Sequence, residues 1–228
     1  MSVAICFHLG YIGRFNEFTP YIDNVINALG RKRNIDIYIT YREDQDPTNM
    51  CLGKYPKAIL LKATHGCDIG AFFAQIKYML NNSKNYKYIF KLHTKSGNIH
   101  HKTWCTDLLE KTAGSQLNVK KIINTFKKHR HSIGMIGSKK WILKREINYQ
   151  IFKDLCTRNK VNDNGYFIGG TIFWVKFSII KNFFTKIDID KEYLSCELGK
   201  PTEPSYTHSW ERILGLIVSS NGYKIYGI

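Results

Sequence analysis

Short apolar segments with the character of β-strands alternate along this chain with amphipathic segments of helical period. The expected strands are residues 3–10, 34–41, 57–63, 86–92, 132–137, 165–175 and 223–228. The expected helices are residues 17–30, 66–80, 119–129 and 208–218. Alternation of this kind is typical of an α/β fold in which helices flank a mostly parallel central sheet. We therefore expect that architecture here.

Nothing in the sequence marks a second domain. The 228 residues contain no internal repeat, no low-complexity tract and no linker rich in proline or serine, and 43% of them are hydrophobic. A chain of this length is within the range of one large domain. We expect a single domain over residues 1–228. Because the sequence ends on an expected strand without a polar tail, this domain is also compatible with the N-terminal part of a longer protein.

Several classes of protein are disfavoured at this level. No apolar run reaches the roughly 20 residues that a membrane-spanning helix needs. Residues 1–10 lack a basic segment and read as a strand, not as a secretory signal. Of the six cysteines, Cys51 and Cys67 are the closest pair at 16 positions apart, so we expect reduced, mostly buried thiols and no zinc site. These features predict a cytoplasmic protein, in the host cell if its source is a virus.

The net charge is strongly positive, with 34 Lys and Arg against 18 Asp and Glu, which gives +16. Residues 120–145 hold nine of the basic residues and no acidic one. This stretch is interpreted either as a solvated helix face with a basic loop or as a surface for an anionic partner. Such a partner is an anionic membrane surface or a phosphate-rich molecule.

Ligands of open α/β sheets bind outside the carboxyl ends of the strands. Applied to the expected strands, this rule selects residues 8–14, 40–42, 65–68 and 93–97 as candidates. The second of these segments comprises Thr40, Tyr41 and Arg42. We expect the side chains of these segments to gather at one edge of the sheet.

Two of these segments carry charged residues with more than one interpretation. Asp68 opens an expected helix, where it either caps the first turn or binds sugar hydroxyls. The loop from His93 to Ser96 is either an ordinary polar loop or an anion site. In the second case Lys95 would pair with a diphosphate, and the hydroxyls of Thr94 and Ser96 would donate to phosphate oxygens. The pattern of a P-loop is absent.

Further candidates lie in the second half of the chain. Gly169 and Gly170 interrupt an expected strand, which indicates either a bulge with close packing or a floor under a bound sugar. His208, Glu211 and Arg212 share one helical face at i, i+3 and i+4. That face is either solvated or carries a general base, Glu211 or His208, next to an anion-binding arginine. The acidic pair in residues 187–190 is interpreted as a loop outside the site.

Five stretches in this order resemble the rhamnan-synthesis F family, whose members are glycosyltransferase-like domains of bacterial polysaccharide assembly. The sequence also resembles the rhamnosyltransferase-type domain of chlorovirus capsid glycosylation. The stretches are "THGCDIGAFF", "YIFKLHTKSG", "WCTDLLEK", "GYFIGGTIFWVK" and "THSWERILGLIVSSNGYK". The D-I-G and K-L-H-T-K segments are the most specific of them, and the likeness runs nearly from end to end.

The resemblance implies a GT-A-like fold and transfer of a sugar, such as rhamnose, from a nucleotide diphosphate such as UDP to a glycan acceptor. It would place Asp68, His93, Thr94 and Lys95 in the donor site. The strand with Gly169, Gly170 and Trp174 would face the donor or acceptor sugar, and the helix with His208, Glu211 and Arg212 would border the reacting centre. Our assignment makes Glu211 the base and His208 its substitute.

The sequence departs from the resemblance at one place that matters for metal binding. Many GT-A enzymes carry an acidic D-x-D where this chain has His93, Thr94 and Lys95. That acidic pair holds a divalent cation on the diphosphate. Binding of Mn²⁺ or Mg²⁺ by other residues remains an alternative, and the sequence does not identify which residues would be the ligands. A lysine and hydroxyls supply part of the positive charge that the leaving diphosphate needs.

Two alternatives belong to other classes of function. The net charge of +16 is compatible with a nucleic-acid-binding protein, although no RRM-like, zinc-finger or helix-turn-helix signature is present. The chain is also compatible with a non-catalytic module that binds glycans or a membrane surface on the same fold. Three functions are therefore compared: a glycosyltransferase binds a nucleotide sugar and turns it over, a nucleic-acid-binding protein does not bind it, and a non-catalytic module does not turn it over.

Overall fold

A computed structural model describes residues 1–30, 34–96, 99–144 and 149–228, without the side chains of residues 99–102. Gly97, at the end of one candidate segment, and Arg145, at the end of the basic stretch, lie outside the described residues. No helix in the described part of the chain has the length and apolar character needed to cross a membrane.

The described strands form a seven-stranded sheet in the order β3-β2-β1-β4-β8-β5-β9. The strands are β1 (Ser2–Leu9), β2 (Asn34–Tyr41), β3 (Ile59–Lys62), β4 (Tyr88–His93), β5 (Ile133–Gly137), β8 (Phe173–Lys176) and β9 (Lys224–Gly227). All neighbours are parallel except β8, which is antiparallel to both β4 and β5. Two further strands, β6 (Ile142–Leu143) and β7 (Phe167–Ile168), pair separately.

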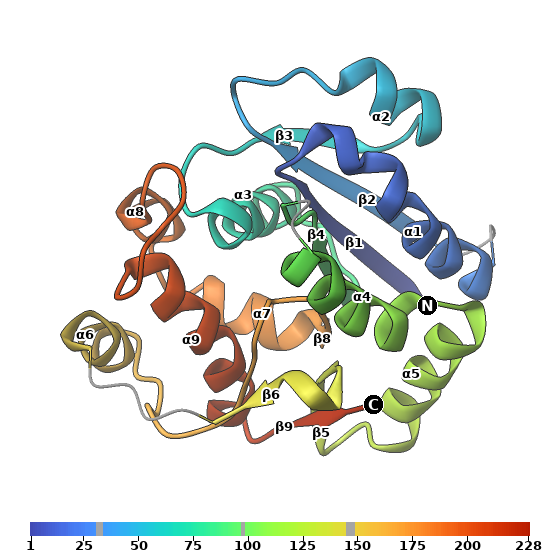
Figure 1. Cartoon of the computed structure of the whole chain (residues 1–228). Helices are drawn as coiled ribbons and strands as arrows, with labels where there is room; N and C mark the ends of the chain where they lie inside the picture. The colour runs from blue at the N-terminus through green and yellow to red at the C-terminus, as the bar shows by residue number, and fades with distance from the viewer. Residues whose placement is uncertain (31–33, 97–98, 145–148) are drawn as a thin grey trace.

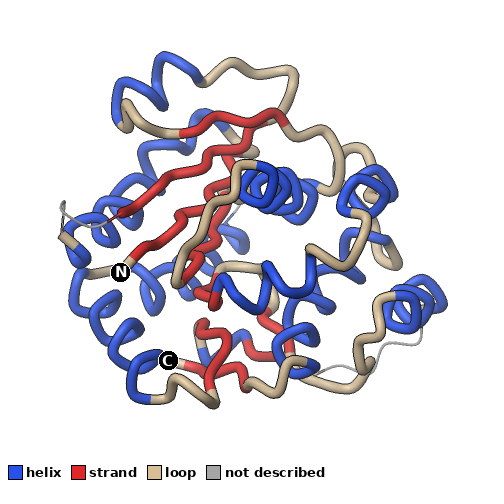
Figure 2. Tube along the Cα trace, turned by 180° about the vertical axis from the view of Figure 1, so that it is seen from behind, coloured by secondary structure: helices blue, strands red, loops and turns tan. Residues whose placement is uncertain are grey.

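Helices cover both faces of this sheet (Figures 1 and 2). On one face, α1 packs with α4 and α5, and on the other α3 packs with α7 and α9. The helices are α1 (Phe15–Leu29), α2 (Thr48–Lys54), α3 (Cys67–Asn81), α4 (Ile99–Ala113), α5 (Gln116–Lys128), α6 (Gln150–Arg158), α7 (Phe177–Phe184), α8 (Ile189–Ser195) and α9 (Tyr206–Ser220), with short 3-10 turns η1 (Ile12–Arg14) and η2 (Lys139–Trp141). The expected α/β fold with a mostly parallel central sheet flanked by helices is confirmed.

The core lies between the sheet and both helical layers. Residues 3–9 of β1 are all buried, because β1 is central and is covered on both faces. In α9, Trp210 is fully buried and its ring packs against Phe73 and Phe184. All six residues of β4 are buried, including Lys91 and His93. Burial of these polar groups requires partners within the fold.

Two predicted features differ from the structure. Residues 165–175 form two strands, β7 and β8, because the chain turns at Gly170 and Thr171, where φ is +80° and +52°. The acidic pair in residues 187–190 is not a loop. Asp188 accepts a hydrogen bond from the backbone N–H of Lys191 at 3.1 Å and so caps α8, whose first turn contains Asp190.

Candidate functional site

A cavity of about 620 Å³ opens at the carboxyl ends of β1, β2 and β4. Its volume is in the usual range of small-molecule sites, roughly 300 to 1,000 Å³. The residues that line it come from segments 8–11, 42–44, 63–69, 93–96, 170–171, 199–201 and 207–211, together with Trp104. The loops after parallel strands therefore meet at one edge of the sheet.

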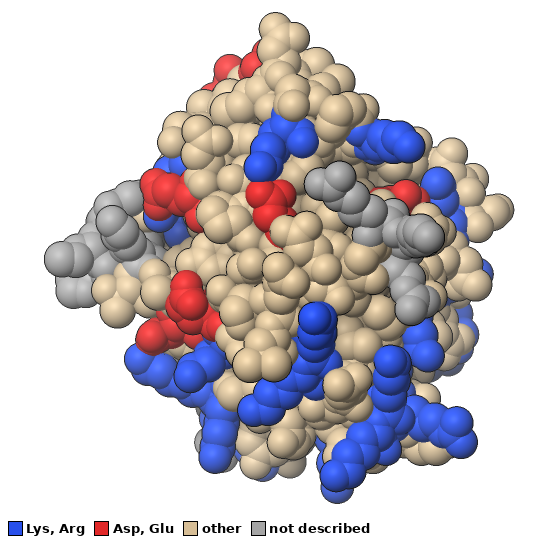
Figure 3. All heavy atoms as spheres, turned by 90° about the vertical axis from the view of Figure 1, so that its right-hand side faces the viewer, with Lys and Arg blue, Asp and Glu red and all other residues tan. Residues whose placement is uncertain are grey.

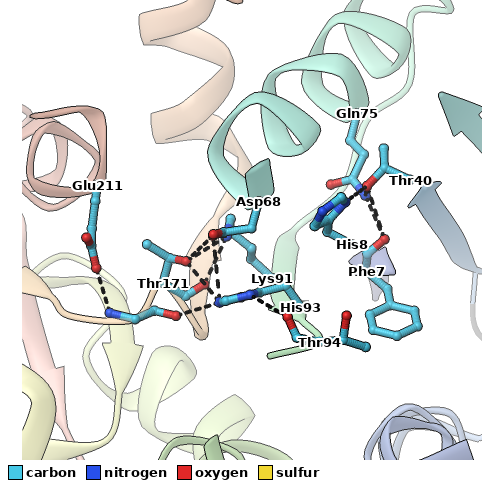
Figure 4. A network of polar contacts seen from close by, with 11 residues as sticks. Phe7, His8, Thr40, Asp68, Gln75, Lys91, His93, Thr94, Thr171 and Glu211 are labelled. Atoms are coloured by element: carbon cyan, nitrogen blue, oxygen red, sulfur yellow. Dashed lines mark hydrogen bonds and ion pairs between the residues drawn. The ribbon is translucent and has the colours of Figure 1, made fainter. Parts of the chain in front are cut away.

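A buried ion pair lies at the floor of this cavity (Figure 4). The Lys91 ammonium on β4 donates to Oδ2 of Asp68 at 2.7 Å and to the carbonyl and hydroxyl oxygens of Thr171 at 3.1 and 2.9 Å. The Thr171 hydroxyl donates in turn to Oδ2 of Asp68. Asp68 therefore does not cap α3, whose N-cap is Gly66. Its carboxylate instead holds β4 to the turn after β7.

The charges of this cluster follow from burial and from its neighbours. Burial acts to raise the pKa of Asp68, but His93, Lys91 and Lys95 outweigh that effect and hold it well below its usual value. Burial lowers the pKa of Lys91, and the adjacent Asp68 carboxylate opposes that shift. Burial likewise lowers the pKa of His93 well below its usual value. The arrangement is a buried Asp68–Lys91 ion pair beside the buried imidazole of His93.

Gly170 connects the two sides of the cavity. Its N–H donates to Oε1 of Glu211 at 2.6 Å, and its carbonyl accepts from Nε2 of His93 at 2.8 Å. Nδ1 of the same ring lies 3.2 Å from the carbonyl of Thr94, so both ring nitrogens face carbonyl oxygens, which can only accept. One residue therefore fixes a carboxylate from α9 and an imidazole from β4. The side chains of Glu211 and His93 are labelled in Figure 4.

A second buried histidine lies at the end of β1. Nδ1 of His8 is 3.2 Å from the hydroxyl of Thr40, whose own proton is donated to the carbonyl of Phe7. The side-chain amide of Gln75 donates to the same carbonyl and hydroxyl, at 3.1 and 3.2 Å. Burial lowers the pKa of His8 to about 4, so a neutral ring lines this part of the cavity.

The loop after β4 is held from the side of η1. The hydroxyl of Thr94 accepts from the N–H of Tyr11 at 2.9 Å, and the Arg14 guanidinium donates to the carbonyls of Lys95 and Ser96. With its backbone fixed, the loop directs the Lys95 side chain along the cavity wall, where its ammonium lies 4.4 Å from the centre of the Trp104 ring.

Nine of the predicted site residues line this cavity, and they are Arg42, Asp68, His93, Thr94, Lys95, Ser96, Gly170, His208 and Glu211. Thr40, Tyr41, Gly169, Trp174 and Arg212 do not line it. The hydroxyl of Thr40 is used between strands, and Tyr41 is buried in β2. Gly169 donates its N–H to the carbonyl of Trp141 at 2.9 Å.

The other two are placed away from the cavity by their own partners. Trp174 is fully buried, stacks on Phe90 at 4.8 Å and donates its indole N–H to the carbonyl of Thr112 at 3.0 Å. Arg212 does not share the exposed face expected for it. Its guanidinium pairs with Glu203 and donates to the carbonyl of His208, and its side chain is 6% exposed.

Sequence reasoning missed Lys91, Thr171 and Lys200. Lys91 could have been predicted, since a lysine inside a strand of buried type requires a counter-ion. Thr171 could not, because its φ of +52° is unusual for a β-branched residue and is imposed by the fold. Lys200 lies in a segment without secondary structure, and only the tertiary fold brings it to the cavity.

The residues beside β4 do not fit a divalent metal. Among the described residues, no group of three or more His, Cys, Asp and Glu is placed to hold a metal ion. Asp68 is the acid next to β4, and the ammonium of Lys91 already lies 2.7 Å from its Oδ2. Asp44, another acid of the cavity wall, pairs with Arg42 at 3.0 Å.

No model of a known protein family matches this sequence, and no curated protein matches it either. The resemblance to the rhamnan-synthesis F family therefore stays a prediction. Solved structures similar to this chain include a 4-diphosphocytidyl-2C-methyl-D-erythritol synthase from Anaerococcus prevotii, at 11% identity and a TM-score of 0.43, over 99% of this chain and 86% of that one. They also include a glucosyl-3-phosphoglycerate synthase from Mycobacterium tuberculosis in complex with Mn²⁺, UDP and phosphoglyceric acid, at 8% identity and a TM-score of 0.42, over 98% and 68% of the two chains. Similarity of this degree defines neither a family nor an activity for this chain.

Proposed function

We propose that this protein is a GT-A-like glycosyltransferase that moves a sugar from a nucleoside diphosphate to a glycan acceptor. The observation that carries the proposal is the composition of one cavity. Basic side chains of Arg42, Lys95 and Lys200 line it together with the backbone-held carboxylate of Glu211. A diphosphate needs the cations, and an acceptor hydroxyl needs a base. The resemblance in sequence suggests rhamnose as the sugar and UDP as a carrier.

The donor would lie along the loop after β4. Lys95 is the basic residue of that loop, and the backbone of the loop is fixed by Arg14, so the ammonium is positioned before a ligand arrives. Thr94 and Ser96 also line the cavity. A charge-assisted hydrogen bond from lysine to phosphate oxygen is stronger than a neutral one. Of the two arginines expected in the donor site, Arg42 is the one that this proposal keeps, because its side chain lines the cavity and is 57% exposed beside Asp44, whereas Arg212 is buried outside the cavity.

The reaction needs one proton acceptor. The oxygen of the acceptor hydroxyl forms a bond to the anomeric carbon, the bond from that carbon to the phosphate oxygen breaks, and the diphosphate leaves with the electron pair. Glu211 would take the hydroxyl proton. Its Oε1 is held by the N–H of Gly170 at 2.6 Å, which orients the carboxylate and leaves Oε2 for the proton. His208, one turn earlier on α9, also lines the cavity and is the second candidate for that role.

A thermal-shift panel of UDP-, GDP-, dTDP- and CMP-sugars, with and without Mn²⁺, tests donor binding directly. A ligand that binds only the folded chain raises its stability. We expect one nucleotide class to raise Tm, and a flat response to all of them would refute the proposal. Turnover is tested with Glu211→Gln, which keeps an oxygen for the N–H of Gly170 but lacks basicity. Glu43→Gln, a change of an exposed acid in the same cavity, is the matched control.

The basic surface suggests where the acceptor is presented. Figure 3 shows Lys and Arg side chains gathered in the lower part of the side that carries α5. The outer face of α5 exposes Lys120, Lys121, Lys127 and Lys128, and Leu117 beside them is 74% exposed. A basic helix face with a protruding apolar residue suits an anionic membrane surface.

Co-sedimentation with vesicles tests this surface. We expect binding to vesicles that contain phosphatidylserine, no binding to pure phosphatidylcholine, and loss of binding in Lys120→Glu/Lys121→Glu. Lys153→Glu/Lys160→Glu, which changes the same charge on and beside α6, is the control. A nucleic-acid-binding protein is the second candidate function, favoured by the same basic residues. Salt-dependent binding to random oligonucleotides without any nucleotide-sugar binding would select it.

A further inference from the structure

The positive charge beside Asp68 belongs to the protein itself. The ammonium of Lys91 is 2.7 Å from Oδ2 of Asp68, 2.9 Å from the hydroxyl of Thr171 and 3.1 Å from the carbonyl of Thr171. An ammonium has three protons, so these three oxygens account for all of its hydrogen bonds. Carboxylate, hydroxyl and carbonyl oxygens are also the ligands that hard metal cations take.

The Lys91 side chain is fixed in that position. It is 2% exposed, and its ammonium lies 5.7 Å from the ring centre of Phe72 and 5.9 Å from that of Phe173. Both rings present faces that attract a cation. A divalent ion bound to the same three oxygens would have to displace the ammonium, because two cations cannot share ligands at this distance without strong repulsion.

We propose that Lys91 is a resident cation that occupies the metal position formed by Asp68 and Thr171. No divalent ion binds at these oxygens, and Asp68 is kept ionised by a side chain and not by a metal. This differs from the acidic D-x-D that many GT-A enzymes carry where this chain has His93, Thr94 and Lys95. Where the proposed function holds, the basic charge that meets the diphosphate comes from the protein, and donor binding does not require Mn²⁺.

Removing the ammonium should turn the position into a metal site. Lys91→Ala leaves the three oxygens around an empty space that a cation can fill. Loss of one partner of a buried ion pair should lower Tm by roughly 6 to 20 °C. Mn²⁺ alone, at a hundred times its dissociation constant, should then raise Tm by roughly 5 to 11 °C. Electron paramagnetic resonance counts the bound Mn²⁺, and we expect one ion per chain.

Two controls separate this site from general binding of Mn²⁺ to acids. Lys77→Ala also removes a lysine from an aspartate, Asp190, at 2.5 Å, but that pair is about half exposed, and within the described part of the chain Asp190 is the hydrogen-bond partner given for the Lys77 ammonium. It should show no bound Mn²⁺ and no rescue. The double variant Lys91→Ala/Asp68→Asn should also lose the ion. A folded Lys91→Ala protein that Mn²⁺ neither binds nor stabilises would overturn the proposal.

If Lys91→Ala does not fold, the proposal is tested on the wild-type protein. We expect the wild-type protein to bind no Mn²⁺, and Mn²⁺ that binds to it but not to Asp68→Asn would overturn the proposal. A further measurement rests on the proposed function: the affinity for UDP should be equal in EDTA and in Mn²⁺, and an affinity at least tenfold higher in Mn²⁺ contradicts the proposal. A chain that binds no nucleotide refutes the proposed function but leaves the result with Mn²⁺ alone intact.

Discussion

Gly170 is the position at which the smallest substitution should have the largest effect. Its φ is +80°, and a Cβ built there would lie 2.1 Å from Cζ2 of Trp104 and 2.8 Å from Cδ1 of Leu108. Real Cβ atoms essentially never lie closer than 3.0 Å to another heavy atom, so the side chains of Trp104 and Leu108 or the turn itself must shift. The same residue holds Glu211 through its N–H and His93 through its carbonyl. Gly170→Ala should therefore change both stability and the cavity.

The magnitude follows from two separate contributions. An L-residue in the left-handed region costs roughly 1 to 2 kcal/mol. Insertion of a methyl group into a packed site costs roughly 1 to 3 kcal/mol. Together they predict that Gly170→Ala lowers the free energy of unfolding by about 2 to 5 kcal/mol. For a domain of this size, that loss lowers Tm by roughly 4 to 20 °C.

Two other glycines separate these contributions. Gly222 has φ +77° and no atom within 4 Å of an added Cβ, so Gly222→Ala should show only the cost of the backbone conformation. Gly53 lies inside α2 without a positive φ and also faces open space, so Gly53→Ala should raise stability by about 0.5 to 1 kcal/mol. Guanidinium unfolding of the three variants gives the free energies, provided that their m-values agree.

The comparison with Gly222→Ala is the decisive measurement. If Gly170→Ala loses no more stability than Gly222→Ala, the ring of Trp104 does not lie over this turn. If it loses more, as we expect, the difference is the cost of the contact with α4. An unchanged affinity for every cavity ligand in a folded Gly170→Ala protein would refute the role of this residue in holding Glu211 and His93.

Three further predictions concern other parts of the molecule. Lys95→Ala should weaken nucleoside-diphosphate binding about ten- to a hundredfold without unfolding the protein, since a hydrogen bond from a charged group contributes about 1.5 to 3 kcal/mol. Unchanged affinity in calorimetry would contradict this. Glu192 is buried between α6 and α9 and accepts hydrogen bonds from Arg158 at 2.7 and 2.9 Å. Glu192→Gln should therefore lower the free energy of unfolding by about 1.5 to 3 kcal/mol. Asp190→Asn, a change in an exposed ion pair, should lower it by at most about 1 kcal/mol in the same chemical unfolding experiment. Burial lowers the pKa of His8 from 6.5 to about 4, so as pH falls the unfolded chain is protonated at His8 before the folded chain is. The free energy of unfolding is therefore highest above pH 6.5 and is lower by about 3 kcal/mol at pH 4. His8→Gln should flatten the stability profile in that pH window, and an unchanged slope would contradict the burial of a neutral ring.

The edge of the sheet at which the cavity lies could be predicted from sequence. Loops after β1, β2 and β4 and the start of α3 meet there because parallel strands end at the same edge. The rule does not extend to residues 165–175, because β8 is antiparallel to β4. The start of β8, near Gly170, therefore lies at the cavity, and Trp174 lies farther along the strand, opposite Phe90. Strand direction depends on connections through the whole fold and has no local signal.

The partner of Lys91 shows a different limit. Side chains two positions apart on a strand share a face, so Lys91 and His93 could be predicted to point the same way. A buried lysine also predicts an acid within reach, but the sequence does not say which acid, and Asp68 lies on a different element. Because Oδ2 of Asp68 is committed to Lys91 and Thr171, only the rest of this carboxylate, whose side chain is 15% exposed, faces the cavity. The acid expected to bind sugar hydroxyls is therefore shared between the fold and the site, and a change at Asp68 acts on both.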